Sequence, residues 1–256
     1  MKYKVAIPSI YRADILNQCT LSFLKQSKVD MERVYVFTTA DCLQEYKKKL
    51  PNDINIIEHG CNGIQETRNY IRRFFKHGET IVGMDDDVKG FWEMVDSKTI
   101  KPNKELTLLT NLIVKHMEIN RTKLGGVNMV TNPFFMNHKI HTKNCLLPAC
   151  FYVFINDHNI MMENPFKLTE DGEMCIKVFK EFGSLIRLNY IGLDMLPNKL
   201  TEGGIQKIMT NDERSIIQKK SDEWLVQEYP EYCSIKKNGV GLRYKTPKVR
   251  NQEKLF

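Results

Sequence analysis

The sequence predicts an α/β fold in which helices flank a mostly parallel β-sheet. Up to residue 88, short runs rich in β-branched residues alternate with amphipathic segments of helical spacing. Their short connections favour βαβ units with right-handed crossovers. The chain has 256 residues, 42% of them apolar and 27% charged. We therefore expect one soluble domain with a single core and a C-terminal tail.

The first part of the chain supplies the regular βαβ pattern. The alternation in "KYKVAIPSI", residues 2–10, predicts a strand that ends at Pro8 and runs into a loop. The apolar positions of 12–27 recur as on one face of a helix. Asp41 is placed as the N-cap of a second helix. Further strands are predicted at 33–39, 54–60 and 80–88, and further helices at 41–50 and 63–78.

The second part is less regular and is expected to extend the same sheet. Amphipathic periodicity predicts helices, and β-branched or aromatic runs predict strands. The predicted helices are 105–121, 170–183 and 212–230, and the predicted strands are 125–132, 148–156 and 185–193.

Charge and cysteine usage limit the class of protein. The net charge is +7, and from Lys236 onward seven basic residues face the single acid Glu253. This tail is expected to be flexible and to bind a polyanion, or else to be a solvated, frayed terminus. Seven cysteines without a CxxC pair argue against a disulfide framework or a zinc ribbon. With no run of membrane-spanning length and no signal peptide, a cytoplasmic protein is expected.

Three consecutive aspartates, Asp85, Asp86 and Asp87, directly follow the apolar run 81–84. Ligands of open α/β sheets bind at the carboxyl ends of strands, which is where this triplet is predicted to lie. Adjacent like charges repel, so a bound divalent cation would explain the triplet. A solvated turn is the alternative, because Asp is common in turns and at N-caps.

In this order, "VAIPSIYR", "GIQETRNYIRRF" and "MDDD" resemble the GT-A glycosyltransferase fold. The resemblance implies a Rossmann-like, mixed, mostly parallel sheet that binds a nucleoside diphosphate sugar. It implies that Asp85 and Asp87 form a DxD motif holding Mn²⁺ or Mg²⁺ on the pyrophosphate, with Asp86 beside the donor. The expected organisation is a nucleotide-sugar half over 1–96, an acceptor half over 97–235, and a basic tail over 236–256.

The resemblance also assigns donor contacts to the loops after the first strands and to the helix that follows the third. Arg68, beside Arg72 and Arg73, could instead lie on a solvated helix face. The implied donor-binding residues are Pro8, Ser9, Arg12, Thr38, Thr39, Asp41, Gly63, Arg68 and Asn69.

The segment "KLTEDGEM" matches the helix start that supplies the catalytic base in many inverting GT-A enzymes. Asp171 is the implied base and Glu170 the second candidate, because a carboxylate can take the proton of an acceptor hydroxyl. The alternative is a carboxylate that stabilises a helix N-terminus. Many relatives add a C-terminal histidine to the metal site, but the last histidine here is His158. Lys245, Lys248 and Arg250 are therefore expected to contact the pyrophosphate or DNA.

The segments "IPSIYR", "DDDV" and "TEGGIQ" are more specifically similar to the TET/JBP-associated glycosyltransferases, which glycosylate hydroxymethylated pyrimidines in DNA. This resemblance implies UDP-glucose as donor, DNA as acceptor and, for a viral protein, the cytoplasm of a phage-infected bacterium. Tyr190, Phe134 and Phe135 are then candidate stacking residues, although aromatic residues more often lie in a core. A non-DNA acceptor, a sugar-phosphate nucleotidyltransferase and a non-catalytic DNA-binding protein remain alternatives. The sequence leaves open the identity of the sugar and nucleotide, the target base, whether the DNA is single- or double-stranded, the anomeric outcome, the third metal or pyrophosphate ligand and the oligomeric state.

Overall fold

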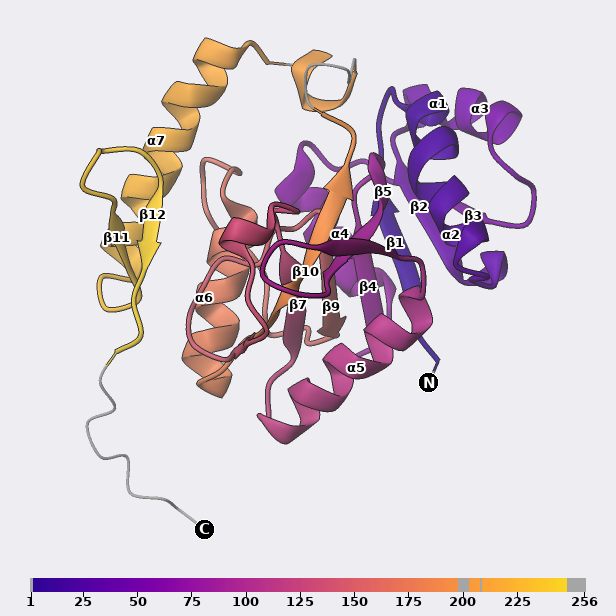
Figure 1. Cartoon of the computed structure of the whole chain (residues 1–256). Helices are drawn as coiled ribbons and strands as arrows, with labels where there is room; N and C mark the ends of the chain where they lie inside the picture. The colour runs from indigo at the N-terminus through magenta and orange to yellow at the C-terminus, as the bar shows by residue number, and fades with distance from the viewer. Residues whose placement is uncertain (1, 198–202, 208, 248–256) are drawn as a thin grey trace.

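A computed structural model describes residues 2–197, 203–207 and 209–247. In these residues the chain forms a 10-stranded mixed sheet of order β3-β2-β1-β4-β9-β7-β10-β5-β6, with β8 paired to β10 (Figure 1). Its strands are β1 Lys4–Pro8, β2 Val34–Thr38, β3 Asn55–Glu58, β4 Thr80–Met84, β5 Val88–Met94, β6 Ile100–Asn103, β7 Leu124–Asn128, β8 Ile140–His141, β9 Phe151–Ile155 and β10 Ile186–Met195. A separate hairpin pairs β11 Cys233–Ile235 with β12 Leu242–Tyr244.

Helices lie on both faces of the sheet. They are α1 Ala13–Leu16, the π-helical η1 Asn17–Leu21, α2 Ser22–Gln26, α3 Ala40–Lys49, α4 Ile64–Phe74, α5 Leu106–Ile119, α6 Glu170–Phe182 and α7 Asn211–Glu228. Short 3-10 turns are η2 Met31–Arg33, η3 Pro133–Phe135 and η5 Gly204–Lys207. None of the helices in the described ranges is both long enough and apolar enough to cross a bilayer.

The strand directions confirm the predicted sheet and show why it is mixed. β1 pairs in parallel with β2 and β4, and β2 pairs in parallel with β3. β9 runs antiparallel to both β4 and β7, so β7 and its parallel neighbour β10 point the same way as β1. β1, β2 and β4 therefore end at one edge of the sheet, where open α/β sheets bind ligands.

The core has two faces because the central strands are buried on both sides. On one face, α1 to α3 and α5 pack against apolar residues such as Val5, Val82 and Val153. On the other face, α4 packs against Phe37 and Ile81, and α6 packs against Phe154. This two-sided burial explains the nearly continuous apolar runs of these strands.

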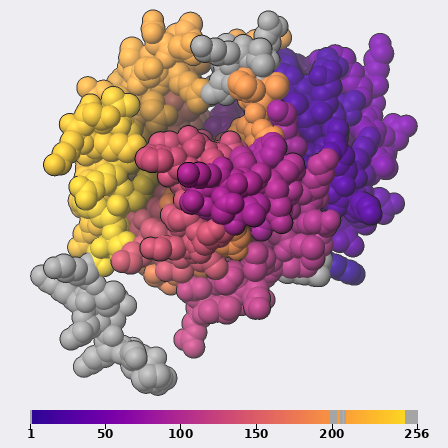
Figure 2. Space-filling model, viewed as in Figure 1, coloured from indigo at the N-terminus to yellow at the C-terminus, as the bar shows by residue number. Residues whose placement is uncertain are grey.

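Several predicted boundaries differ from the structure. The strand predicted over 80–88 is β4 followed by a turn and then β5, because β5 leaves β4 and pairs with β10. The single helix predicted over 12–27 is interrupted by η1. The tail expected to be flexible from Lys236 includes β12, because Leu242 packs with Leu225 and Cys233 (Figures 1 and 2).

Candidate active site

The turn that follows β4 carries Asp85, Asp86 and Asp87, and tertiary contacts fix its backbone. Asp85 N donates to Cys150 O at 3.0 Å. Thr20 Oγ1 donates to Asp85 O at 2.8 Å and accepts from Val88 N at 3.0 Å. Thr20 lies in the π-helical turn η1, a type of irregularity that is frequent at functional sites. The Thr20 hydroxyl in this turn thus bonds the backbone at Asp85 and at Val88, on both sides of the aspartate triplet.

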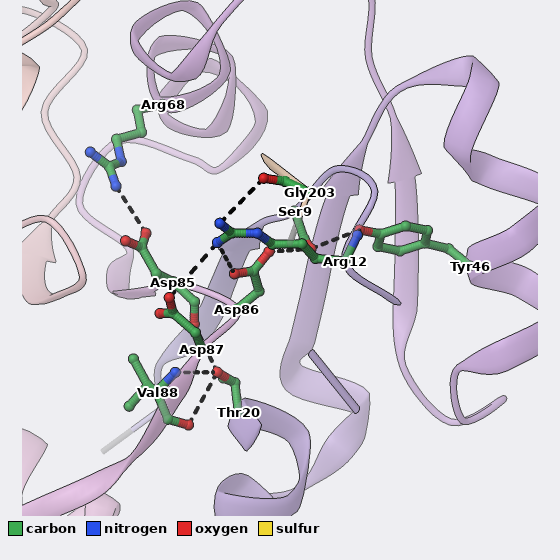
Figure 3. Close-up of polar contacts among 10 residues, drawn as sticks. All are labelled: Ser9, Arg12, Thr20, Tyr46, Arg68, Asp85, Asp86, Asp87, Val88 and Gly203. Carbon is green, nitrogen blue, oxygen red and sulfur yellow. Dashed lines mark hydrogen bonds and ion pairs between the residues drawn. The ribbon is translucent and has the colours of Figure 1, made fainter. Parts of the chain in front are cut away.

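Asp86 is held by the loop that follows β1 (Figure 3). The Ser9 hydroxyl donates to Asp86 Oδ2 at 2.7 Å, and Arg12 Nη1 lies 3.3 Å from Asp86 Oδ1. The Tyr46 hydroxyl, 2.8 Å from Ser9 Oγ, accepts from Arg12 N at 3.1 Å. Burial raises the pKa of Asp86 to about 6, although Ser9 and Arg12 oppose this rise. The structure therefore brings Ser9, Arg12 and Asp86 together, as the sequence predicts.

Asp87 is the least compensated of the three carboxylates. It is only 4% exposed, and its Oδ1 finds no hydrogen-bond partner in the part of the chain that the structure describes. Its other oxygen lies 3.8 Å from Arg12 Nη1. Burial, together with the charges of Asp85 and Asp86, raises the pKa of Asp87 to about 7. A bound dication would supply the missing partner and lower this pKa.

Arg68 connects the aspartate turn to the start of α6. Its Nη2 lies 3.0 Å from Asp85 Oδ1, and its Nη1 forms an ion pair with Glu170 Oε1. Only 5% of the arginine side chain is exposed, so it does not lie on a solvated helix face. The two carboxylates hold the pKa of Arg68 above its usual range, against the opposing effect of burial. Arg68 is therefore positioned to orient Asp85 as well as Glu170.

Asp171 follows Glu170 in the first turn of α6, near the aspartate turn. Burial and the neighbouring Glu170 raise the pKa of Asp171 to about 7. Its Oδ1 accepts from Gly172 N at 2.7 Å. A Cβ added at Gly172 would lie 2.6 Å from the Tyr244 hydroxyl, so glycine lets the C-terminal hairpin approach this turn. A carboxylate with a pKa near neutrality is suited to act as a general base.

The residues predicted at the end of β2 lie at the same edge of the sheet. Thr38 is fully buried. Thr39 is the N-cap residue of α3, and the predicted N-cap Asp41 lies instead in the first turn, where it accepts a hydrogen bond from the Tyr11 hydroxyl. Pro8 ends β1 in register with Phe37. Pro8, Thr38 and Thr39 thus lie at the ends of two adjacent parallel strands.

Two residues predicted to approach the donor through α4 have contacts of their own. Gly63 precedes α4 with φ of 87°, and its carbonyl accepts from Thr67 Oγ1 at 3.0 Å. The Asn69 side chain donates to Met162 O at 2.8 Å and accepts from Met162 N at 3.0 Å. These bonds give Asn69 the role of anchoring the loop before α6 to α4.

Of the three tail residues expected to contact the pyrophosphate or DNA, the structure describes Lys245, whose backbone is tied to neighbouring segments. Lys245 N donates to Tyr232 O at 2.7 Å, and Lys245 O accepts from Asn144 Nδ2 at 2.8 Å. Tyr232 packs against Phe179 in the second half of α6. Lys248 and Arg250 lie outside the described residues.

Sequence reasoning missed contacts that depend on tertiary approach. Thr20 and Tyr46 lie within helices, where nothing in the pattern separates them from ordinary helical residues. The two glycines of "TEGGIQ" could have indicated a close contact between segments, because such a contact requires residues without a side chain. A Cβ on Gly203 would lie 2.4 Å from Tyr11 O, and Gly203 O accepts from Arg12 Nη2 at 3.4 Å. Gly203 and Gly204 therefore lie against the Arg12 loop.

The donor set at this edge fits a divalent cation that shares its ligands with a diphosphate. Within the described ranges, no group of three His, Cys, Asp or Glu side chains converges as a metal cage. Mg²⁺ and similar ions are commonly held by one or two carboxylates together with substrate phosphates and water. Asp85 and the unpartnered Asp87 Oδ1 are the available carboxylate groups.

The chain is similar in sequence or fold to known glycosyltransferases. The family model described as TET-Associated Glycosyltransferase matches residues 3–204, and no curated protein matches the chain. S. aureus TarS 1-349 in complex with UDP-GlcNAc superposes with a TM-score of 0.58 at 14% identity, over 88% of this chain and 67% of that chain. The mannosyltransferase PcManGT from Pyrobaculum calidifontis, in complex with GDP-Man and Mn²⁺, superposes with a TM-score of 0.55 at 11% identity, over 88% of this chain and 64% of that chain.

The chain thus spans about two thirds of the length of these solved glycosyltransferases. At such low identity the structural likeness shows the GT-A fold, and the family match, which covers most of the chain, shows the relationship. The chain belongs to the TET-associated glycosyltransferase family and is a glycosyltransferase of the GT-A type.

Proposed function

We propose that this enzyme transfers glucose from UDP-glucose, in a metal-dependent reaction, to a hydroxymethylated pyrimidine in DNA. The observation that carries the proposal is the aspartate turn, where three carboxylates share two arginines and Asp87 Oδ1 has no partner among the described residues. An uncompensated buried carboxylate is expected where a cation binds. The family match favours this reaction over nucleotidyl transfer and over non-catalytic DNA binding.

Asp85 and Asp87 would hold Mn²⁺ or Mg²⁺, with Arg68 orienting Asp85. When bound, the cation neutralises the charge that develops on the departing diphosphate. Arg12 Nε is buried and has no partner among the described residues, so it is available to a phosphate oxygen. The complexes of proteins of similar fold with UDP-GlcNAc, and with GDP-Man and Mn²⁺, support a nucleotide sugar as the donor.

Asp171 would take the proton of the acceptor hydroxyl. A carboxylate with a pKa of about 7 is partly ionised at neutral pH and accepts a proton more readily than an ordinary aspartate. Glu170 is already paired with Arg68, so it is the weaker candidate. A base on the acceptor side implies inversion at the anomeric carbon.

DNA as acceptor is supported by the family match and by the net charge of +7. A hydroxymethyl group on a pyrimidine base can be reached in the major groove, by flipping the base out, or on a single strand.

The test is a transfer assay with a panel of nucleotide sugars, with Mn²⁺ or EDTA, on oligonucleotides carrying hydroxymethylcytosine or hydroxymethyluracil. Matched unmodified oligonucleotides are the acceptor control. We expect a mass increase of one hexose on modified strands with UDP-glucose and Mn²⁺, and none in EDTA. Nucleotide-sugar hydrolysis without transfer to any modified DNA would refute the acceptor and leave the donor assignment standing. Full transfer in EDTA would refute the metal.

A further inference from the structure

Large apolar side chains are exposed on the segment that follows β7. Phe134 is 83% exposed and Phe135 62%, and Met129 and Val130 are exposed beside them. An exposed cluster of this kind commonly marks a binding surface. The catalytic arrangement described above uses none of these residues.

The two phenyl rings are presented by a constrained turn. Pro133 occupies the first position of η3, and the Asn132 side chain accepts from Phe134 N at 3.0 Å. Asn128 Nδ2 donates to Phe135 O at 3.2 Å, which ties the turn to the end of β7. The ring centroids of Phe134 and Phe135 lie 5.0 Å apart, with the planes nearly perpendicular. Ordering these rings on binding therefore loses little conformational freedom.

The charge of this segment is of one sign. Between Glu118 and Asp157 the sequence has no acidic residue. Downstream of the phenylalanines, His138, Lys139 and Lys143 are exposed. Basic side chains interleaved with exposed aromatic rings are the pattern of surfaces that bind single-stranded nucleic acid.

The surface lies close to the aspartate turn along β10. A Cβ at Gly192 would lie 2.3 Å from Val130 O, so the segment packs directly on this strand. Further along the chain, just beyond β10, Leu196 N donates to Asp87 O at 2.9 Å. Gly192 and Leu196 are four residues apart, which corresponds to about 13 Å of extended chain. One bound DNA strand can therefore contact both the segment that follows β7 and the aspartate turn.

A cavity of about 530 Å³ adjoins this surface, between α5, the β5–β6 hairpin and β10. Tyr190 lines the cavity, and its ring stacks on His138 with centroids 6.4 Å apart. Lys101 and Lys104 also line it, together with Glu93, which lies 3.7 Å from Lys101. In Figure 2 the segment that follows β7 and the hairpin adjoin on the viewed face.

We infer that residues 129–143 form a docking surface for the unpaired strand of the DNA acceptor, with bases stacked on Phe134 and Phe135 and phosphates on Lys139 and Lys143. The inference rests on the proposed function, because it names where that acceptor binds. The stacked tyrosine and histidine extend the aromatic surface toward the cavity.

The test measures binding of fluorescein-labelled single-stranded DNA by anisotropy, in the presence of UDP and Mn²⁺. A variant carrying both Phe134→Leu and Phe135→Leu keeps apolar bulk and removes the aromatic faces. We expect its affinity to fall about 10- to 100-fold, from the typical contribution of one or two base–aromatic stacks. The control is Ile119→Ala, which shortens a side chain that is 65% exposed at the C-terminal end of α5. This variant should bind single-stranded DNA like the parent.

A second variant separates stacking from charge. Replacing Lys139 and Lys143 by Gln should reduce the slope of log affinity against log salt by about 1.4, the value for two phosphate contacts on a single strand. The phenylalanine variant should keep the parent slope and the parent UDP-induced rise in Tm. Unchanged DNA affinity in the phenylalanine variant, or binding restricted to duplex DNA, would overturn this surface while leaving the proposed reaction intact. A parent enzyme that neither binds nor modifies DNA would overturn both.

Discussion

Replacing Asp87 by Asn should stabilise the metal-free protein at high pH while abolishing transfer. The change removes a buried charge and preserves the side-chain shape. The pKa of Asp87 rises from an ordinary value of 3.8 to about 7 because of burial and the adjacent aspartates. At 1.36 kcal/mol for each pH unit, the ionised carboxylate destabilises the fold by up to about 4 kcal/mol. Water entry and local relaxation reduce the expected gain to about 2 to 4 kcal/mol.

The pH dependence has a definite sign. The pKa of Asp87 is higher in the folded state, so the folded protein binds the proton more tightly than the unfolded chain does. Below about pH 4 the carboxyl is protonated in both states and the variant should match the parent. The difference should grow between about pH 4 and 7 and be complete at pH 8.

The assay is urea unfolding followed by circular dichroism at pH 4 and pH 8 in EDTA. The control is Asp53→Asn, a surface substitution that should change the unfolding free energy by less than about 0.5 kcal/mol. Adding Mn²⁺ with UDP should stabilise the parent, by about 2.7 kcal/mol at a hundred times the dissociation constant, and should leave Asp87→Asn unchanged. Equal stability of Asp87→Asn and parent at pH 8 in EDTA would refute the uncompensated carboxylate, and undiminished transfer would refute its metal role.

Three further predictions test the rest of the site. Asp171→Asn should lower the transfer rate by about 10²- to 10⁴-fold with donor affinity unchanged. The transfer rate of the parent should fall as the pH drops below about 7, because the base must be ionised. An active variant, together with retention of the anomeric configuration measured by NMR, would remove Asp171 from the mechanism. Arg68→Lys should lower the unfolding free energy by about 3 kcal/mol, because one ammonium cannot bridge Asp85 and buried Glu170; a loss below about 0.5 kcal/mol in urea would contradict the bridge. Neutralising Lys245, Lys248 and Arg250 together should weaken DNA binding without sequence preference and flatten its salt dependence; an unchanged salt slope would exclude these residues from phosphate contacts.

The sequence predicted most of the sheet because its central strands are buried on both sides. Continuous apolar runs with β-branched residues identify such strands directly. β5 was missed for a local reason: Val88 follows the aspartates at once and continues the β-branched pattern of β4. Only the pairing of β5 with β10 reveals that the chain has turned. The π-helical turn η1 was equally invisible, because helical spacing persists across it.

Some residues of the candidate site could be predicted from the sequence and others could not. The aspartate triplet could be named from its place after an apolar run, and Ser9, Arg12 and Asp171 from the resemblance of their segments to GT-A glycosyltransferases. Tyr46 could not, since it reaches Ser9 by tertiary approach alone. The backbone contacts of Lys245 with Tyr232 and Asn144 could not be read from the composition of the tail either, and the phosphate contact of its side chain stays a prediction.

The position of β9 affects how the protein is synthesised and how it can be recombined with relatives. β9 lies between β4 and β7, so the outer edge of β4 has no partner until residue 155 has been made. Arg68 meets Glu170 still later in the chain. A ribosome-bound chain ending near residue 96 would therefore expose an open strand edge and an arginine lacking one carboxylate. Chimeras between family members should exchange β9 and the start of α6 together with the aspartate turn, because a crossover between them separates groups that stabilise one another.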